Sequence, residues 1–403
     1  MRCFRFLLTL LALSLAAACQ STQVAPIDTA HQPLALAPDE RKLWDEAQHV
    51  QRRIEAIGLV YTNVELEAYI HSVAVRLVAD QLQNPGLELK VRVLREPYRN
   101  AFVLPNGTFY ITTGMLACLD NEAELAFLLG HETTHYTHRH LLKEKRGASN
   151  RKVWVDIFGG TSVLVGLGPI LGEISSTWAT SAFFGYSQEL ETEADEHGLE
   201  EMVQTGYDPQ ASLTVFKYLG EEEELDSLVT KERDLTHPRM KERVDHCREL
   251  LVTRYGAAVV EPGRRINQDE YYAQIQQLLL DNAALDEAAG RPEFARRAVD
   301  KYVARWPDCA PGYFSRGEIC RRSQDPNVRA QGQAAYREAV RLDPGYAEPH
   351  RELGLLYRSE GQLQEARDEF AAYAALSTQA IDTRTILRYV SELDAELAAS
   401  PAP

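Results

Sequence analysis

The sequence predicts an α+β fold in which a mostly helical domain with a small β-sheet precedes a second domain made of helices alone. Three patterns lead to this prediction. Apolar residues recur at helical spacing in residues 39–78, a strand-like alternation and an Asn-Gly turn follow in residues 87–112, and helical repeats rich in Ala, Tyr, Arg and Glu follow residue 263. A chain of 403 residues is long enough for two such domains.

The first eighteen residues are typical of a secretion signal. Arg2 and Arg5 precede an uncharged stretch that ends in small residues before Cys19. The run 15–19 resembles the lipobox of bacterial lipoproteins, which implies lipidation of Cys19 and, with Gln20 following, the outer membrane. Plain secretion with cleavage near Ala18 is the alternative. Residues 19–38 are then predicted to be a lipidated tether.

The charge balance argues against nucleic acid as a partner. The formal net charge is −16, and it becomes −18 once Arg2 and Arg5 leave with the signal. An acidic chain without a basic cluster repels phosphate.

Four cysteines remain after the signal and the lipid site are set aside, and an oxidising compartment permits disulfides. Cys118 with Cys247 is one possible pair. Cys309 and Cys320 would be about 16 Å apart on one helix, which is beyond disulfide reach.

Each element of the first domain follows from a local pattern. Residues 43, 47, 50 and 54 form one apolar helical stripe, and residues 87–93 alternate like a half-buried strand. Segments 101–104 and 108–112 flank Pro105-Asn106-Gly107, which predicts a hairpin. An amphipathic helix then begins near Asn121, with Glu124 completing a capping box.

Residues 157–188 carry a single charge and are interrupted by glycines. Neither half is long enough to span a membrane. We predict a buried or partly mobile loop with short helices, and a membrane-dipping segment or an active-site lid is the alternative.

The helix that begins near Asn121 carries a metal-binding pattern. His131 and His135 are four residues apart, so both imidazoles face one cation, and Glu132 stands beside the same face. A zinc site needs a third protein ligand and a position for water. Glu191 and Asp195 share a helix face, so Glu191 can bind the metal while Asp195 orients a ligating imidazole.

Other polar residues near these motifs are given different roles. A third imidazole ligand at His138 would strain a tetrahedral site. Glu189 and Glu193 are predicted to be solvated, and the remaining nearby histidines to be structural or exposed: His140, His197 and His246.

Taken together, these motifs resemble the M48 family of zinc metallopeptidases over about residues 40–250. The matching segments are Gly130–His135, Glu191–Asp195, Asn121-Glu122, Arg139-His140, Asn100-Ala101-Phe102, and His237-Pro238 with Arg243. The family often has an arginine three residues before the ligating glutamate, where this chain has Gln188, which puts a local ion pair in doubt but not zinc binding.

The resemblance implies roles for individual residues in a zincin-type domain covering residues 39–255. It implies one Zn²⁺ per chain, held by His131, His135 and Glu191, with Glu132 as catalytic residue. His237 would also act at the site, either by stabilising the oxyanion or by occupying the fourth zinc position in a latent state. Arg243 and Asp195 would be neighbours of the ligands, and substrate would add as a strand along Asn100, Ala101 and Phe102.

Residues 266–400 resemble tetratricopeptide repeats. Aligning Pro307 with Pro344 superimposes the apolar positions of successive helices, and about three hairpins can be counted over residues 268–396, with a short insertion at 323–328. With a signal in front, the whole chain resembles the β-barrel assembly-enhancing protease group.

This resemblance implies a periplasmic endopeptidase for misfolded or stalled outer-membrane proteins, whose repeats bind clients or the barrel assembly machinery. Two alternatives stay open. One is a chaperone or adaptor with a latent zinc site, and the other is a purely structural zinc site, which would leave no position for water.

Overall fold

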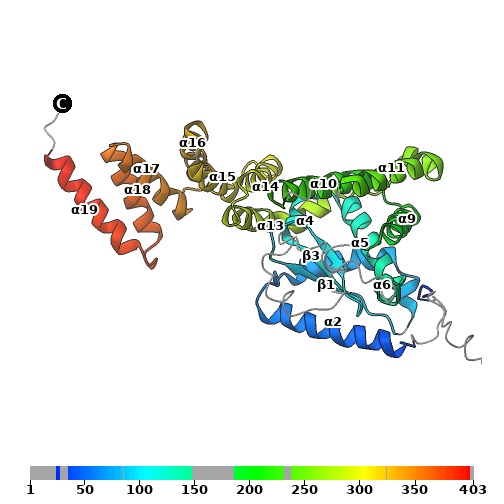
Figure 1. Cartoon of the computed structure of the whole chain (residues 1–403). Coiled ribbons are helices and arrows are strands. Elements are labelled where there is room, and N and C mark those ends of the chain that lie inside the picture. Colours follow the sequence, from blue (N-terminus) through cyan, green and yellow to red (C-terminus); the bar gives the residue numbers. More distant parts are fainter. Residues whose placement is uncertain are drawn as a thin grey trace, which may run out of the picture. The chain divides into compact units, whose positions relative to one another are not determined.

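The computed structural model describes residues 24–27, 35–84, 86–147, 186–230, 237–323 and 325–399 (Figure 1). The predicted signal, Cys19 and nearly all of the segment 157–188 lie outside these residues. The chain divides into two compact units, Met1–Ile275 and Gln276–Pro403. No helix in the described ranges has the length and apolar character needed to cross a membrane.

The first unit is built from helices around one small sheet, which confirms the predicted α+β class. Its helices are α2 (Pro38–Ala56), α3 (Val64–Leu77), η1 (Gln81–Gln83), α4 (Thr113–Cys118), α5 (Glu122–Thr137), α6 (His140–Gly147), α9 (Gln188–Gln204), α10 (Ala211–Thr230), α11 (His237–Thr253) and α12 (Gly256–Val260). The predicted stripe of α2 is buried and forms one core with sheet residues that include Leu94, Phe102 and Tyr110.

The sheet has three strands, β1 (Lys90–Leu94), β2 (Ala101–Val103) and β3 (Thr108–Thr112), in the order β1-β3-β2. β2 and β3 form the predicted antiparallel hairpin, with Gly107 at φ +78° in the turn. β1 pairs parallel to β3 and begins at Lys90 rather than at residue 87. The reason is that β3 begins at Thr108, the partner of Lys90, so Leu87 and Leu89 are buried without a strand to pair with.

Helix α5 begins as predicted, but it is not amphipathic. Asn121 accepts a hydrogen bond from the Glu124 main-chain N–H at 3.0 Å, and the Glu124 carboxylate accepts one from Asp120 N–H at 2.6 Å. Every residue of α5 is buried, because α3, α9, α10 and β2 all pack against it. The chemical residues of this helix therefore lie inside the unit and not on one face of a surface helix.

The carboxylate of Glu122, the first residue of α5, collects four hydrogen bonds in a buried position. The hydroxyls of Tyr69 and Tyr207 donate at 2.8 and 2.6 Å, Arg76 at 2.9 Å and the Asn267 side chain at 2.8 Å. These partners come from α3, from the loop after α9 and from the segment before α13, so this carboxylate ties the start of α5 to three distant parts of the sequence.

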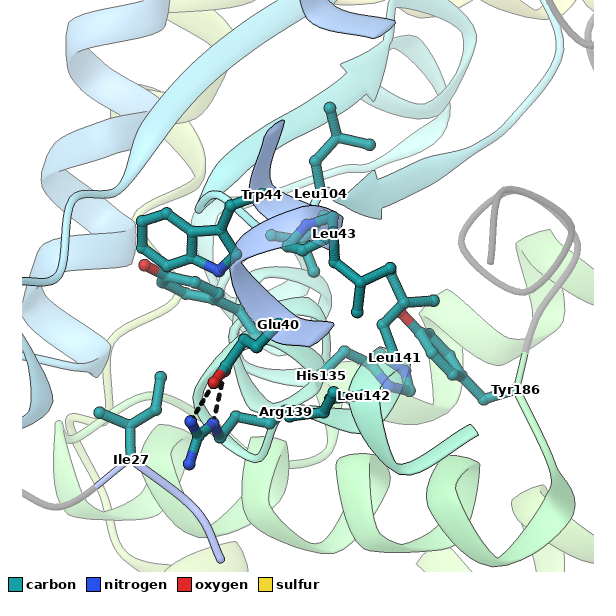
Figure 2. A pocket seen from close by; sticks show the side chains of 13 residues that line it. Ile27, Glu40, Leu43, Trp44, Leu104, His135, Arg139, Leu141, Leu142 and Tyr186 are labelled. Atoms are coloured by element: carbon teal, nitrogen blue, oxygen red, sulfur yellow. Dashed lines mark hydrogen bonds and ion pairs between the residues drawn. The ribbon is translucent and has the colours of Figure 1, made fainter. Parts of the chain in front are cut away.

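The segment 24–27 lies against the first unit near the end of α5. Ile27 N–H donates to Thr137 C=O at 2.7 Å, and the side chains of Val24 and Ile27 are buried. Ile27 also lines a pocket beside the ion pair of Arg139 with Glu40 (Figure 2). This part of the predicted tether therefore has a fixed position on the first unit.

The second unit consists of the rest of α13 (Gln268–Ala288) and of α14 (Pro292–Arg305), α15 (Ala310–Arg322), α16 (Pro326–Leu342), α17 (Ala347–Ser359), α18 (Leu363–Leu376) and α19 (Thr383–Ala399). Helices α15 and α16 pack together, as do α17 and α18, and α19 packs on α18. Within these pairs an aromatic ring covers a glycine of its partner helix: Tyr336 on Gly317, and Phe370 on Gly354. A Cβ would overlap either ring, so the glycines permit the close packing.

The boundary between the units falls inside α13 and not before it. The first turn of this helix belongs to the first unit because the Tyr271 hydroxyl donates to Leu116 C=O at 2.6 Å and Tyr272 donates to Asp120 at 2.9 Å. None of the described cysteines, Cys118, Cys247, Cys309 and Cys320, forms a disulfide bond, so the possible Cys118–Cys247 pair is not made.

One buried carboxyl in the first unit should make stability depend on pH. Glu201 in α9 is buried, its Oε2 has no hydrogen-bond partner among the described residues, and burial raises its pKa well above the usual range. The folded chain therefore binds the Glu201 proton more tightly than the unfolded chain does. The contribution of Glu201 to the free energy of unfolding is therefore fully present below the pKa that this group has in the unfolded chain. It is lost as the pH rises through the higher pKa of the folded chain.

We predict that Glu201→Gln raises the free energy of unfolding at pH 8, by on the order of 1 kcal/mol, and changes it little at pH 5. Urea unfolding at the two pH values measures the effect. The exposed Glu249→Gln is the matched control and should change neither value. An equal effect of Glu201→Gln at both pH values would contradict the prediction.

Candidate metal centre

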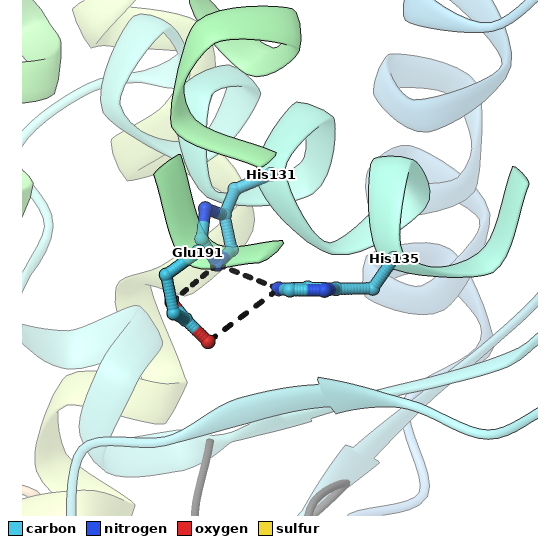
Figure 3. Close-up of side chains that lie close together, drawn as sticks. All are labelled: His131, His135 and Glu191. Carbon is cyan, nitrogen blue, oxygen red and sulfur yellow. Dashed lines mark hydrogen bonds and ion pairs between the residues drawn. The ribbon is translucent and has the colours of Figure 1, made fainter. Parts of the chain in front are cut away.

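Three side chains from two helices converge on one point in the first unit (Figure 3). His131 and His135 lie one turn apart on α5, and their Nε2 atoms are 3.0 Å apart. Glu191 on α9 places Oε2 3.5 Å from His131 Nε2 and Oε1 3.8 Å from His135 Nε2. Ligands bound at about 2.0 Å to a tetrahedral zinc ion are separated by about 3.3 Å, so this set of two imidazoles and one carboxylate fits zinc.

The other ring nitrogen of His131 is held by Asp195. His131 Nδ1 lies 2.8 Å from Asp195 Oδ1, which leaves Nε2 directed at the shared point. Asp195 in turn accepts two hydrogen bonds from Arg243, both of 2.8 Å, and Arg243 also lies 2.9 Å from Glu191. Arg243 from α11 thus holds two acidic residues of α9, Glu191 and Asp195.

The buried charges in this cluster balance one another. Burial opposes ionisation of Glu191, yet Arg243 and the imidazoles hold its pKa well below the usual range. Burial also disfavours a charged His131, but its carboxylate partners raise the pKa to about 10. Burial and the charge of His131 keep the pKa of His135 well below its usual value. The two carboxylates therefore favour a positive charge at this point, which a divalent cation supplies.

His135 also has a partner for its second nitrogen, and sequence reasoning missed it. His135 Nδ1 lies 2.8 Å from Nδ1 of the fully buried His140, whose Nε2 lies 3.3 Å from Glu193 Oε2. Burial lowers the pKa of His140 to about 2, so this imidazole is neutral. Arg139, at φ +58°, turns the chain between α5 and α6 and so brings His140 back against α5.

The position of Glu193 differs from expectation, whereas His138 lies outside the ligand set as expected. Glu193 is not a solvated surface group, because it contacts His138, His140 and Lys143 and its side chain is 31% exposed. His138 lies outside the first ligand set, with Nδ1 2.6 Å from Glu193 Oε1. Glu193 thus draws the imidazole of His138 into a second group of polar residues.

Glu132 lies between α5 and the edge of the sheet. It is buried, and its carboxyl group is hydrogen-bonded by the Val103 main chain of β2. Burial raises the pKa of Glu132 to about 8 in spite of this bond and of the nearby His131. Helix α5 packs against β2, so the acid and the edge strand face each other across the site.

The register of β2 shows which of its main-chain groups point away from β3. Asn100 C=O and Leu104 N–H bond to β3, and Phe102 is paired with Tyr110, so the even-numbered residues face β3. The main chain at Ala101 and Val103 faces the outer edge of β2, which pairs with no strand among the described residues and where Val103 bonds to Glu132. The Asn100 side-chain amide is buried without a hydrogen-bond partner among the described residues, whereas the Phe102 ring stacks on Tyr110 in the core.

A small pocket that is partly open to solvent lies beside His135 (Figure 2). Its walls include Leu43, Trp44, Leu104 and Tyr186, and the ring of Tyr186 stacks on His135 at 4.0 Å. His237 is the first residue of α11, and its side chain is not described.

Two imidazoles and a carboxylate on crossing helices, with a buried glutamate between them and an edge strand, define a metallopeptidase domain of the zincin class. Residues 64–251 match Peptidase family M48, and this domain belongs to that family. The match confirms the family predicted from the motifs, and it does not extend to the helices of the second unit.

Curated relatives include both mitochondrial and bacterial enzymes. The chain is 31% identical over 135 residues to "Mitochondrial metalloendopeptidase OMA1" of Arabidopsis thaliana, covering 34% of this chain and 26% of the relative. It is 29% identical over 192 residues to "Beta-barrel assembly-enhancing protease" of Escherichia coli strain K12, covering 45% and 38%. It is 30% identical over 184 residues to "Mitochondrial metalloendopeptidase OMA1" of Schizosaccharomyces pombe, and the match covers 45% of this chain and 52% of the relative. The matched part thus spans between about a quarter and a half of each relative.

The close crossing of α5 and α9 depends on two glycines. A Cβ at Gly198 would lie 2.9 Å from His131 N, and one at Gly130 would lie 3.0 Å from Gly198 Cα. We predict that Gly198→Ala pushes α9 away from α5, moves Glu191 from the imidazoles and weakens zinc binding about tenfold or more. Zinc affinity measured with a competing chelator tests this.

The control for Gly198→Ala is Gly220→Ala in α10, where a Cβ would meet only ordinary van der Waals contact. This variant should bind zinc like the wild type. Unchanged zinc affinity in Gly198→Ala would show that the crossing does not set the ligand geometry.

Proposed function

We propose that the chain is a zinc-dependent endopeptidase with one catalytic Zn²⁺ held by His131, His135 and Glu191. The observation that carries the proposal is the convergence of these three ligands next to Glu132 and the outer edge of β2. The family of the domain and the metalloendopeptidase names of its relatives support it.

Glu132 is the proposed acid and base of the reaction. When bound, zinc supplies a water of lowered pKa and polarises the scissile carbonyl. Glu132 takes the proton of the attacking water and returns it to the leaving amine nitrogen. Its burial excludes bulk water from the carboxyl group, and its bond to β2 holds it beside the strand on which substrate would lie.

Substrate would bind as an extra strand along β2. The main chain of Ala101 and the C=O of Val103 face the outer edge of β2, whereas Val103 N–H bonds to Glu132, and the Asn100 Nδ2 offers a donor for a substrate carbonyl. Main-chain pairing of this kind fixes an extended peptide with little sequence selection. Of the three residues expected to contact substrate, Phe102 has its ring in the core and its main chain paired with Tyr110, so its role would be to support the strand.

Asp195, Arg243 and His237 complete the proposed catalytic site. Asp195 orients His131, and Arg243 holds Asp195 and Glu191 in place. For His237 we propose one of two roles, stabilising the oxyanion or occupying the fourth zinc position in a latent state. Its place at the start of α11, six residues before Arg243, supports a position near the metal.

The proposed setting is the periplasm, with the chain anchored to the outer membrane through lipid on Cys19. The proposed substrates are misfolded or stalled outer-membrane proteins, and the helices after residue 266 would act as tetratricopeptide-like repeats that bind clients or the barrel assembly machinery. The lipobox-like run, the helix pairs of the second unit and the beta-barrel assembly-enhancing name of several relatives support this assignment.

We predict that Glu132→Gln keeps its zinc but lowers casein cleavage by about 10²- to 10⁴-fold, because no carboxylate remains to move the proton. Zinc content and cleavage rate are measured on the same preparation. The exposed Glu249→Gln serves as the control and should retain full activity. Substantial peptidase activity in Glu132→Gln would overturn the assignment of the catalytic residue.

A comparison of wild type with His237→Ala distinguishes a peptidase from a chaperone or adaptor. If His237 occupies the fourth zinc position, its removal should raise the rate of casein cleavage, and if it stabilises the oxyanion, its removal should lower that rate. Cleavage is measured with zinc-loaded protein. We expect activity in at least one of the two proteins, and inactivity of both would favour the adaptor.

A further inference from the structure

A second group of metal-binding residues lies at the end of α5, outside the catalytic ligand set. His138, Glu193 and His197 each offer a ligand atom, and these atoms lie within 4.8 Å of one another. His138 Nδ1 is 2.6 Å from Glu193 Oε1, and the rings of His138 and His197 are 4.4 Å apart. All three side chains are partly exposed, at 16%, 31% and 42%, so an ion can reach them from solvent.

The chemistry of this group matches the catalytic set, with two imidazoles and one carboxylate. Such a donor set selects zinc over magnesium or calcium, which prefer oxygen ligands. To admit zinc, His138 Nδ1 and Glu193 Oε1 would exchange their shared hydrogen for the metal and move apart by about 0.7 Å. Partly exposed side chains can make this movement, and water completes the coordination.

The second group lies next to His140, the imidazole that is hydrogen-bonded to the catalytic ligand His135. Glu193 Oε2 lies 3.3 Å from His140 Nε2, and His140 Nδ1 lies 2.8 Å from Nδ1 of His135. With His135 Nε2 directed at the catalytic point, His135 Nδ1–H donates to His140 Nδ1. The buried His140 Nε2–H makes no hydrogen bond among the described residues, and the Glu193 carboxylate is its charged neighbour at 3.3 Å. Glu193 therefore lies beside the imidazole that orients a catalytic ligand, and it also belongs to the second group.

We propose that His138, Glu193 and His197 form a second, weaker zinc site through which excess zinc lowers the activity of the catalytic centre. Zinc at this site draws the Glu193 carboxylate toward His138 and His197, and the buried Nε2–H of His140 loses the negative charge beside it. His140, and through it His135, is then held less firmly. The existence of the site is independent of the proposed function, and only the effect on activity depends on it.

Lys143 makes the second site weaker than the first. Its ammonium group lies 3.1 and 3.2 Å from the two Glu193 oxygens, so a zinc ion must bind beside an existing positive charge. Removing this charge should strengthen the second site, while removing an imidazole should weaken it. The two substitutions therefore have opposite expected effects on the same quantity.

Zinc stoichiometry of the full chain tests the site directly. The Glu132→Gln background is used to prevent self-cleavage, and metal-free protein is equilibrated with Zn²⁺ and analysed for bound metal. We expect two zinc ions per chain, one in the added His197→Ala variant, and at least tenfold tighter binding of the second ion in Lys143→Ala. The control His246→Ala removes an imidazole that is paired with Glu196 away from the group, and it should still bind two.

One zinc ion in the unsubstituted background, or two in His197→Ala, would overturn the second site. The effect on activity is measured separately, by casein cleavage in rising Zn²⁺. His197→Ala should need at least tenfold more zinc than wild type for half-inhibition, and equal inhibition of the two would overturn the regulatory role. If neither cleaves casein, the proposed function fails, whereas the stoichiometry still decides whether the second site exists.

Discussion

The close approach of α5 and α9 is the constraint on which the metal centre depends. At Gly130 and Gly198 the two backbones leave no space for a Cβ, so the helices cross at the turn where His131 begins the ligand series. Two turns earlier along α9, Glu191 reaches the point on which His131 and His135 converge. A wider crossing would separate a carboxylate from imidazoles that are already fixed by their own helix, because interiors are close-packed and adjust little.

A third helix, α11, completes the metal centre by compensating buried charges. Arg243 on α11 lies against Asp195 and Glu191 and compensates two carboxylates that burial would otherwise drive to accept protons. The same carboxylates attract a cation and hold His131 in one orientation. The electrostatics and the geometry of the site thus come from the same contacts, between segments more than forty residues apart in the sequence.

Local patterns predicted much of the fold, whereas tertiary contacts decided what the sequence left open. The α2 stripe, the Pro105–Gly107 hairpin and the Asn121 cap each depend on neighbouring residues, and each is present. The burial of α5 on all sides was not foreseen, because it depends on α9 and α10, which come much later in the chain.

The candidate site shows the same division. The residue types at 131, 132, 135 and 191 already indicate zinc chemistry, since helical spacing places His131 with His135 on one face and Glu191 with Asp195 on another. His140 was set aside because nothing in the sequence shows that Arg139 adopts a left-handed conformation and returns the chain to His135. Gly198 has no motif of its own, and its role depends on which helix crosses it.

The fixed position of Val24–Ile27 limits how far the peptidase unit could move from a membrane. If Cys19 carries lipid as proposed, four residues lie between the anchor and Val24, and the five Cα-to-Cα steps of a fully extended chain span about 18 Å. Because Ile27 is hydrogen-bonded to α5, residues 28–38 do not lengthen the connection between the anchor and the first unit. The unit would then act as a surface-bound enzyme of short range, whose substrates are selected first by their distance from the membrane.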